Sequence, residues 1–190
     1  MGNSGKHILT SDGENLSFFQ RNLADYLTLS RVIISFVILS LSFVGKDAYI
    51  VVVILTLAGG ATDILDGKAA RHYLGHDKEG KLGKHDVEID TLFVLSVMAY
   101  LTFSGIVVPK PIGLGWISLV LVATAISNRS QKVLVPSEIL TVIALLFIAL
   151  VYDLLVFGTI IAPAMTVGLV VNRRRVLYLI FDYWPKLFSR

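Results

Sequence analysis

The sequence predicts an all-α polytopic membrane protein with six transmembrane helices, and three observations support this fold class. Hydrophobic residues make up 55% of the 190 residues and charged residues only 16%, whereas an ordinary soluble domain is about 25% charged. The hydrophobic residues fall in long runs. Lysine and arginine gather in alternate connections between these runs. A soluble fold could not bury so much apolar surface, so we expect the chain to lie in a lipid bilayer.

Apolar runs between charged residues define six segments. They cover residues 26–44, 48–65, 89–106, 112–127, 136–151 and 154–171. In hydrocarbon each segment must be helical, because lipid offers no partner for free backbone N–H and C=O groups. Some segments are shorter than the roughly 20 residues of a typical span. We expect residues 26–175 to form one transmembrane domain.

The basic residues predict how the chain crosses the membrane. Five lysines and arginines lie between the second and third segments, while the connections on the other side hold only Lys46 and Lys110. Because basic residues accumulate on the cytoplasmic side, both termini and the loop after residue 65 are expected there. The net charge of +3 then faces anionic lipid, and a nucleic-acid partner is not expected.

The two ends of the chain are more polar or more aromatic than the core. Residues 1–25 are expected to be a cytoplasmic leader, in which residues 16–25 suit a short helix on the membrane surface. An ordinary polar leader is the alternative. Residues 176–190 are rich in tyrosine, tryptophan and phenylalanine, which predicts an interfacial tail.

Four aspartates lie at the inner ends of the second and third segments. Asp63 and Asp66 are three residues apart, and Asp86 and Asp90 are four apart, so each pair shares one helix face. Four carboxylates about 4 Å apart would repel one another strongly unless cations lay between them. Because the chain has no cysteine, oxygen ligands and hard divalent ions are expected. The pattern predicts two Mg²⁺ or Mn²⁺ ions.

Small residues continue the face of the first acidic pair. Gly67 and Ala70 leave the helix backbone open to a bulky ligand, and Arg71 offers donors that suit a pyrophosphate. The histidines of this region, among them His72 and His85, are interpreted as solvated loop residues. The simpler alternative is that the acids mark the membrane boundary and that the small residues permit close helix packing.

Together these residues resemble the signature of the CDP-alcohol phosphotransferase (CDP-alcohol phosphatidyltransferase) family, D-x-x-D-G-x-x-A-R followed by G-x-x-x-D-x-x-x-D. Seven positions match: Asp63, Asp66, Gly67, Ala70, Arg71, Asp86 and Asp90. The resemblance implies transfer of a phosphatidyl group from a CDP-linked lipid such as CDP-diacylglycerol to a small alcohol, with release of CMP. It also implies a homodimer, a role in phospholipid biosynthesis and an active site at the cytoplasmic face.

The resemblance also implies roles for the matched residues. Asp63, Asp66, Asp86 and Asp90 would hold the metal pair, and Asp90 would also be the general base on the acceptor hydroxyl. Donor binding would involve Asp63, Asp66, Gly67, Ala70, Arg71 and Gly83. The family glycine before the third aspartate is Leu82 here, and Gly83 lies one residue later. This shift leaves the shape of the cytidine site open.

A second resemblance concerns the acceptor. Thr28 and Arg31 match the N-x-P-N-x-L-T-x-x-R opening of the phosphatidylglycerophosphate synthase branch, which favours glycerol 3-phosphate. Arg129 and Lys132 are candidates for binding its phosphate, although cytoplasmic positive charge explains them equally well. Thr91 stands where many members that use glycerophosphate carry lysine. Inositol phosphate, serine or another alcohol therefore stays open as the acceptor.

Two other classes of protein are alternatives to an enzyme. A cation transporter would also carry acidic residues in membrane helices, but near the middle of the bilayer and often on interrupted helices. Here the acids cluster at one boundary. A non-catalytic scaffold could retain the acids for packing alone. Release of CMP from a CDP-linked lipid would distinguish the enzyme from both.

Overall fold

The computed structural model describes the backbone of residues 11–73, 86–106, 108–126, 131–171 and 173. It describes the side chains of those residues except 11–24, 66–73, 86, 87, 131 and 132. All regular structure in this part of the chain is helical, which confirms the all-α prediction.

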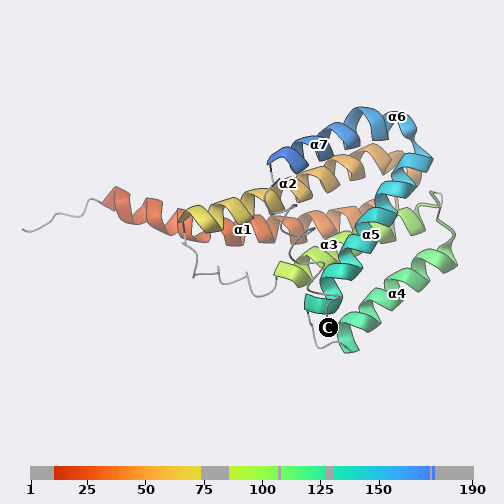
Figure 1. Ribbon diagram of the computed structural model, residues 1–190, viewed down its shortest axis with the longest axis horizontal. Coiled ribbons are helices and arrows are strands. Elements are labelled where there is room, and N and C mark those ends of the chain that lie inside the picture. Colours follow the sequence, from red (N-terminus) through yellow and green to blue (C-terminus); the bar gives the residue numbers. More distant parts are fainter. Residues whose placement is uncertain (1–10, 74–85, 107, 127–130, 172, 174–190) are drawn as a thin grey trace, which may run out of the picture.

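The helices follow one another as antiparallel rods (Figure 1). In chain order they are α1 (Ser11–Leu41), η1 (Gly45–Ala48), α2 (Tyr49–Tyr73), α3 (Asp86–Phe103), α4 (Lys110–Ile126), α5 (Gln131–Tyr152), α6 (Leu154–Val156), the π-helical turn η3 (Phe157–Ile161) and α7 (Ala162–Val171). Each of the six predicted apolar segments overlaps one of these rods, and α6, η3 and α7 together form the last of them.

The N-terminal part of the fold differs from the prediction in one respect. Residues 16–25 are helical, but they belong to a continuous 31-residue α1 and do not form a separate short helix. No proline or glycine follows Gly13 within α1, so nothing in the sequence interrupts the helix. Residues 1–10 and 174–190 lie outside the described part of the chain, and the interfacial tail stays a prediction.

Helix α3 lies at the centre of the bundle. It packs against α1, α4 and α5 and also contacts α2. Its side chains are buried on several faces, among them Phe93, Leu95, Val97, Met98, Tyr100 and Leu101. A helix that is buried all round belongs to the interior of a bundle. The start of α3, which carries Asp90, is therefore held by neighbours on several sides.

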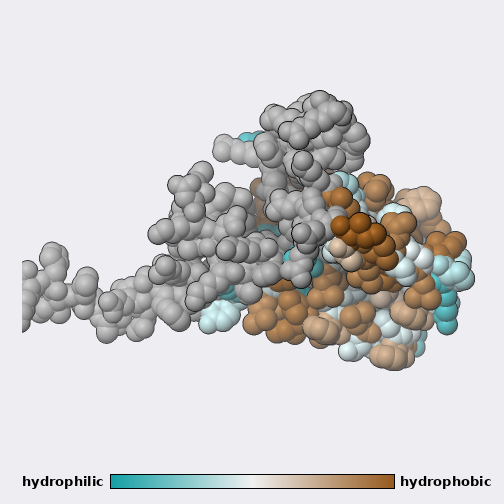
Figure 2. Space-filling view, turned by 90° about the horizontal axis from the view of Figure 1, so that it is seen from below, coloured by the Kyte–Doolittle hydropathy of each residue, from teal (hydrophilic) through white to brown (hydrophobic). Residues whose placement is uncertain are grey.

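The outer surface of the bundle is strongly apolar. Many large hydrophobic side chains are exposed, including Phe36, Phe43, Phe147 and Leu155, and brown hydrophobic residues cover most of the described face in Figure 2. Soluble monomers rarely expose patches of this extent. Within the described residues, three helical stretches are long and apolar enough to cross a membrane, and Lys110–Ile126 is a shorter apolar helix. The three are Gly45–Leu65, Val133–Tyr152 and Leu154–Val171. These findings support an integral membrane protein, while the number of six spans stays a prediction.

The end of the bundle opposite the aspartates is closed by aromatic side chains. The Tyr100 hydroxyl donates a 2.8 Å hydrogen bond to the Gly45 carbonyl. The rings of Tyr49 and Tyr152 meet edge to face at 4.8 Å. Asp153 caps α6 by accepting hydrogen bonds from the next backbone N–H groups. These contacts join α2, α3 and α5 and so support the helices that carry the aspartates at their other end.

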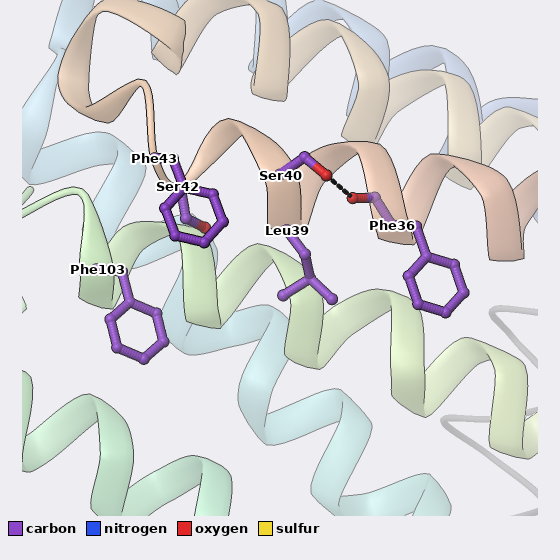
Figure 3. A pocket seen from close by; sticks show the side chains of 6 residues that line it. All are labelled: Phe36, Leu39, Ser40, Ser42, Phe43 and Phe103. Carbon is purple, nitrogen blue, oxygen red and sulfur yellow. Dashed lines mark hydrogen bonds between the residues drawn. The ribbon is translucent and has the colours of Figure 1, made fainter.

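A groove of about 600 Å³ also lies at this end, between the last turns of α1 and α3. Phe36, Leu39, Phe43 and Phe103 line it together with Ser40 and Ser42 (Figure 3). Ser40 donates a hydrogen bond to the Phe36 carbonyl within its own helix. Among the side chains that the structure describes, no charged one lines the groove, so these residues offer no group for acid–base or metal chemistry.

Candidate active site

A buried arginine on α1 brings two of the predicted site aspartates together. The Arg31 side chain is 1% exposed. Its Nη1 donates to Asp63 Oδ1 of α2 at 3.4 Å, and the same nitrogen donates to Asp90 Oδ1 of α3. The carboxylates are 35% and 30% exposed, so they remain accessible from one side. Asp63 and Asp90, from two different helices, therefore lie beside the same guanidinium nitrogen.

The position of Arg31 follows from the buried face of α1. Thr28, Arg31, Ser35 and Ile38 are each at most 2% exposed, and their spacing is that of one helix face. The Thr28 hydroxyl lies 3.5 Å from Arg31 Nη2. Ser35 donates to the backbone carbonyl of Arg31. This buried face of α1 is polar near the aspartates and apolar toward the other end of the helix. The one charged residue among these four, Arg31, therefore lies at the level of the carboxylates of α2 and α3.

For the other matched positions the structure describes only the backbone. Asp66, Gly67, Ala70 and Arg71 lie in the last turns of α2, and Asp66 follows Asp63 by about one turn. Asp86 is the first residue of α3, about one turn before Asp90. The backbone is helical at all of these positions. The roles of their side chains stay predictions.

The remaining predicted site residues lie at or beyond the limits of the described chain. Gly83 and Arg129 lie outside the described residues. Lys132 lies in the first turn of α5, where only the backbone is described. The donor role of Gly83 and the acceptor roles of Arg129 and Lys132 therefore stay predictions.

The carboxylate oxygens of Asp63 and Asp90 suit a hard divalent cation. Among the described side chains, no three His, Asp or Glu residues form a metal-binding group. Asp63 and Asp90 nonetheless converge on one point, and carboxylate oxygens are the ligands that Mg²⁺ and Mn²⁺ prefer. Asp66 and Asp86 lie about one helical turn from them on the same helices.

A second polar contact beside the site was not predicted. Thr91, directly after Asp90 and 6% exposed, donates a 2.6 Å hydrogen bond to Glu138 Oε1 of α5. This contact ties the start of α3 to α5. Glu138 is the only acid within the apolar segment 136–151, and an ionisable residue in a membrane helix is a signal of function. The same signal, an arginine inside an apolar run, would have drawn attention to Arg31.

The distance between α2 and α3 near the aspartates depends on Gly59. A Cβ atom at this position would lie 2.4 Å from Cζ of the Phe93 ring, which is far inside contact distance. Gly59 precedes Asp63 by about one turn, and Phe93 follows Asp90 by about one turn. The Phe93 ring is buried and fills the space that a side chain at residue 59 would need. The missing side chain therefore lets the two acidic helix ends approach.

We predict that Gly59→Leu separates α2 from α3 and lowers activity at least tenfold. Overpacking of this kind costs about 1–3 kcal/mol of stability, so the thermal unfolding temperature should also fall. Gly115→Leu is the matched control, because Gly115 lies in α4, which carries none of the aspartates, and a Cβ atom there meets nothing within 4 Å. Both variants can be compared by thermal unfolding in detergent and by the rate of CMP release. Equal behaviour of the two variants would contradict this role of Gly59.

An apolar cavity of about 250 Å³ extends from the region of the aspartates into the bundle. It lies between α2, α3, α5 and α7, and its lining includes Val53, Gly60, Phe93, Leu145 and Met165. Gly60 is close to Asp63 along α2, and Phe93 is close to Asp90 along α3. The cavity therefore reaches to within about one helical turn of Asp63 and Asp90, and its apolar lining suits the apolar tail of an amphipathic substrate.

Comparisons with known proteins give one match. No curated protein and no solved structure matches the chain significantly. Residues 21–172 match the CDP-alcohol phosphatidyltransferase family, and this match spans α1 from Arg21 onward, both acidic helix ends and the helices to α7. The chain therefore belongs to the CDP-alcohol phosphatidyltransferase family, whose members transfer substituted phosphate groups from a CDP-alcohol to an acceptor.

Proposed function

We propose that the protein transfers the phosphatidyl group of CDP-diacylglycerol to a small alcohol, with glycerol 3-phosphate as the preferred acceptor, and releases CMP. The observation that carries this proposal is the convergence of Asp63 and Asp90, from two different helices, on Arg31. A reaction that needs metal ligands and a base at one place requires such a convergence. Inositol phosphate, serine and another alcohol are the alternative acceptors.

Each matched residue has a role in this proposal. Asp63, Asp66, Asp86 and Asp90 would hold two divalent ions, Mg²⁺ or Mn²⁺, which would supply positive charge for the donor pyrophosphate and the leaving group. The small residues Gly67 and Ala70 admit the nucleotide, with Gly83 beside it. Arg71 donates to the pyrophosphate. Arg129 and Lys132 bind the phosphate of the acceptor.

The proposed reaction is an in-line displacement. Asp90 accepts the proton of the acceptor hydroxyl, and the resulting oxygen attacks the phosphorus that carries diacylglycerol. The bond from this phosphorus to the bridging oxygen breaks, and its electron pair leaves with CMP. Arg31 holds Asp90 at Oδ1, and a carboxylate suits the base role because it can accept the proton of a hydroxyl. The partial exposure of Asp90, 30%, supports access for the acceptor.

The membrane setting supports a lipid donor. The apolar cavity beside Gly60 and Phe93 and the apolar outer surface offer places for acyl chains, while the headgroup reaches the aspartates. We place the active site at the cytoplasmic face, because the basic residues gather on that side. A homodimer is part of the proposal through the family resemblance.

The test is an assay of the full-length protein in detergent or lipid nanodiscs. It contains CDP-diacylglycerol, Mn²⁺ and one acceptor at a time from glycerol 3-phosphate, inositol phosphate, serine and glycerol. CMP is measured by chromatography, and the lipid product is identified by mass spectrometry. We expect CMP to form in step with phosphatidylglycerophosphate. If CMP is released only with another acceptor, that acceptor replaces glycerol 3-phosphate in the proposal. If no acceptor gives CMP, the proposed function is wrong.

A further inference from the structure

Arg31 is the most deeply buried charged side chain that the structure describes, and it lies among groups expected to bind metal. It is 1% exposed, and one of its nitrogens contacts carboxylates of two different helices, 32 and 59 residues further along the chain. A buried cation is tolerated only where opposite charge surrounds it. Among the described side chains, Asp63 and Asp90 supply opposite charge here, and they are the same groups to which the proposed function assigns metal binding and proton transfer.

The guanidinium and a divalent ion cannot both neutralise the same carboxylate oxygen without cost. Two cations about 4 Å apart repel each other by several kcal/mol when the effective dielectric constant is near 20. Arg31 donates to Oδ1 of Asp63 at 3.4 Å, which is near the upper limit of hydrogen-bond distance. Arg31 Nη2 also lies close to the Thr28 hydroxyl. The contact to Asp63 is therefore the one that a metal ion would displace first.

We propose that Arg31 is a positioning residue that anchors Asp90 and competes with the metal ions for Asp63. This inference rests on the proposed function for the roles of the two aspartates. Before metal binds, the guanidinium supplies positive charge to the acidic helix ends, so α1, α2 and α3 can pack without ions. When metal binds, Arg31 releases Asp63 but keeps its contact with Asp90. The Asp90 carboxylate then stays oriented for the acceptor hydroxyl.

The residue type at position 31 fits this role. An arginine presents a planar fork of donors that can bond several oxygens at once, whereas a lysine offers a single compact charge. Asp63, Asp90 and Thr28 contact Arg31 through two of its terminal nitrogens. A lysine at this position would contact one carboxylate at a time. Its positive charge would therefore compete less strongly with a metal ion for Asp63.

The test measures metal binding by the full-length protein in phosphatidylcholine nanodiscs after removal of ions with EDTA. Mn²⁺ is titrated in, and the free ion is followed by electron paramagnetic resonance. We expect Arg31→Gln to bind Mn²⁺ on the order of three- to tenfold more tightly than the unmodified protein, because a competing cation is removed. Its unfolding temperature without metal should fall, and saturating Mn²⁺ should restore it.

Ser35→Ala is the matched control. Ser35 lies one turn after Arg31 on the same buried face and bonds only the backbone carbonyl of Arg31 through its hydroxyl. This variant should leave Mn²⁺ affinity unchanged. Arg31→Lys provides a second test if Arg31→Gln does not fold. It should bind Mn²⁺ about two- to threefold more tightly than the unmodified protein, since its single ammonium leaves Asp63 partly open.

If Mn²⁺ affinity is unchanged or weaker in both Arg31 variants, the proposal that Arg31 competes with metal ions for Asp63 is wrong. Recovery of stability by Mn²⁺ to the same extent in the unmodified protein and in Arg31→Gln would also contradict it. Asp63→Asn separates this failure from failure of the proposed function. If Asp63→Asn binds Mn²⁺ as tightly as the unmodified protein, the metal site itself is assigned wrongly, whatever the Arg31 variants show.

Discussion

Asp90→Asn is expected to lower CMP release by about a hundredfold to ten-thousandfold, the range that a general base contributes. An amide cannot accept the proton of the acceptor hydroxyl. Its oxygen can still accept the hydrogen bond that Arg31 gives to Asp90, so the helix ends should keep their arrangement. The measurement is the rate of CMP release from CDP-diacylglycerol at saturating acceptor and Mn²⁺, together with the unfolding temperature.

Asp153→Asn is the control for this experiment. Asp153 caps α6 by accepting hydrogen bonds from two backbone N–H groups. It directly follows Tyr152, whose ring meets that of Tyr49, the first residue of α2, away from Asp63. Asparagine is also a good cap, so activity and stability should stay near those of the unmodified protein. If Asp90→Asn released CMP at the unmodified rate while Asp153→Asn behaved as expected, Asp90 would not be the base.

Asp63→Ala is expected to lower CMP release by about a hundredfold or more, because it removes a carboxylate ligand from the proposed ions. It also removes a carboxylate that Arg31 contacts. Removal of divalent ions with EDTA should abolish activity of the unmodified protein, and added Mn²⁺ should restore it. In Asp63→Ala, any residual CMP release should need much higher Mn²⁺ concentrations than CMP release by the unmodified protein.

Asp47→Ala serves as the comparison for Asp63→Ala. Asp47 is an exposed aspartate in η1, at the end of the bundle that carries Tyr49 and Gly45. Its removal changes the net charge by the same amount but touches no proposed ligand. A similar loss of activity in both variants would indicate a general effect of charge, and a metal requirement that does not change in Asp63→Ala would exclude Asp63 as a ligand.

The positions of the helices could be predicted well from the sequence. Each apolar segment corresponds to a helical rod, because lipid-facing backbone must form its hydrogen bonds internally. The ends were predicted less well. Helices α1 and α2 continue through polar residues beyond the apolar segments, to Ser11 at one end and Tyr73 at the other. Hydrophobicity marks where a chain meets lipid, whereas a helix ends only where backbone geometry or a breaking residue stops it.

The sequence by itself determined what lies on one helix. The spacing of Asp63 from Asp66, and of Asp86 from Asp90, sets a shared helix face, because 3.6 residues per turn relates neighbouring side chains within any helix. The seven matched signature positions likewise indicate the family through residue type and spacing along the chain alone. Both inferences depend on local periodicity and on the chemistry of single residues.

Only the tertiary structure decided which faces meet. The contacts of Arg31 with Asp63 and Asp90, the hydrogen bond from Thr91 to Glu138, and the approach of Phe93 to Gly59 each join different helices. Such contacts depend on how each helix is rotated and packed against its neighbours, and that arrangement results from the fit of all side chains together. Periodicity along a single helix contains no information about this arrangement, so the role of Arg31 follows only from the way α1, α2 and α3 pack together.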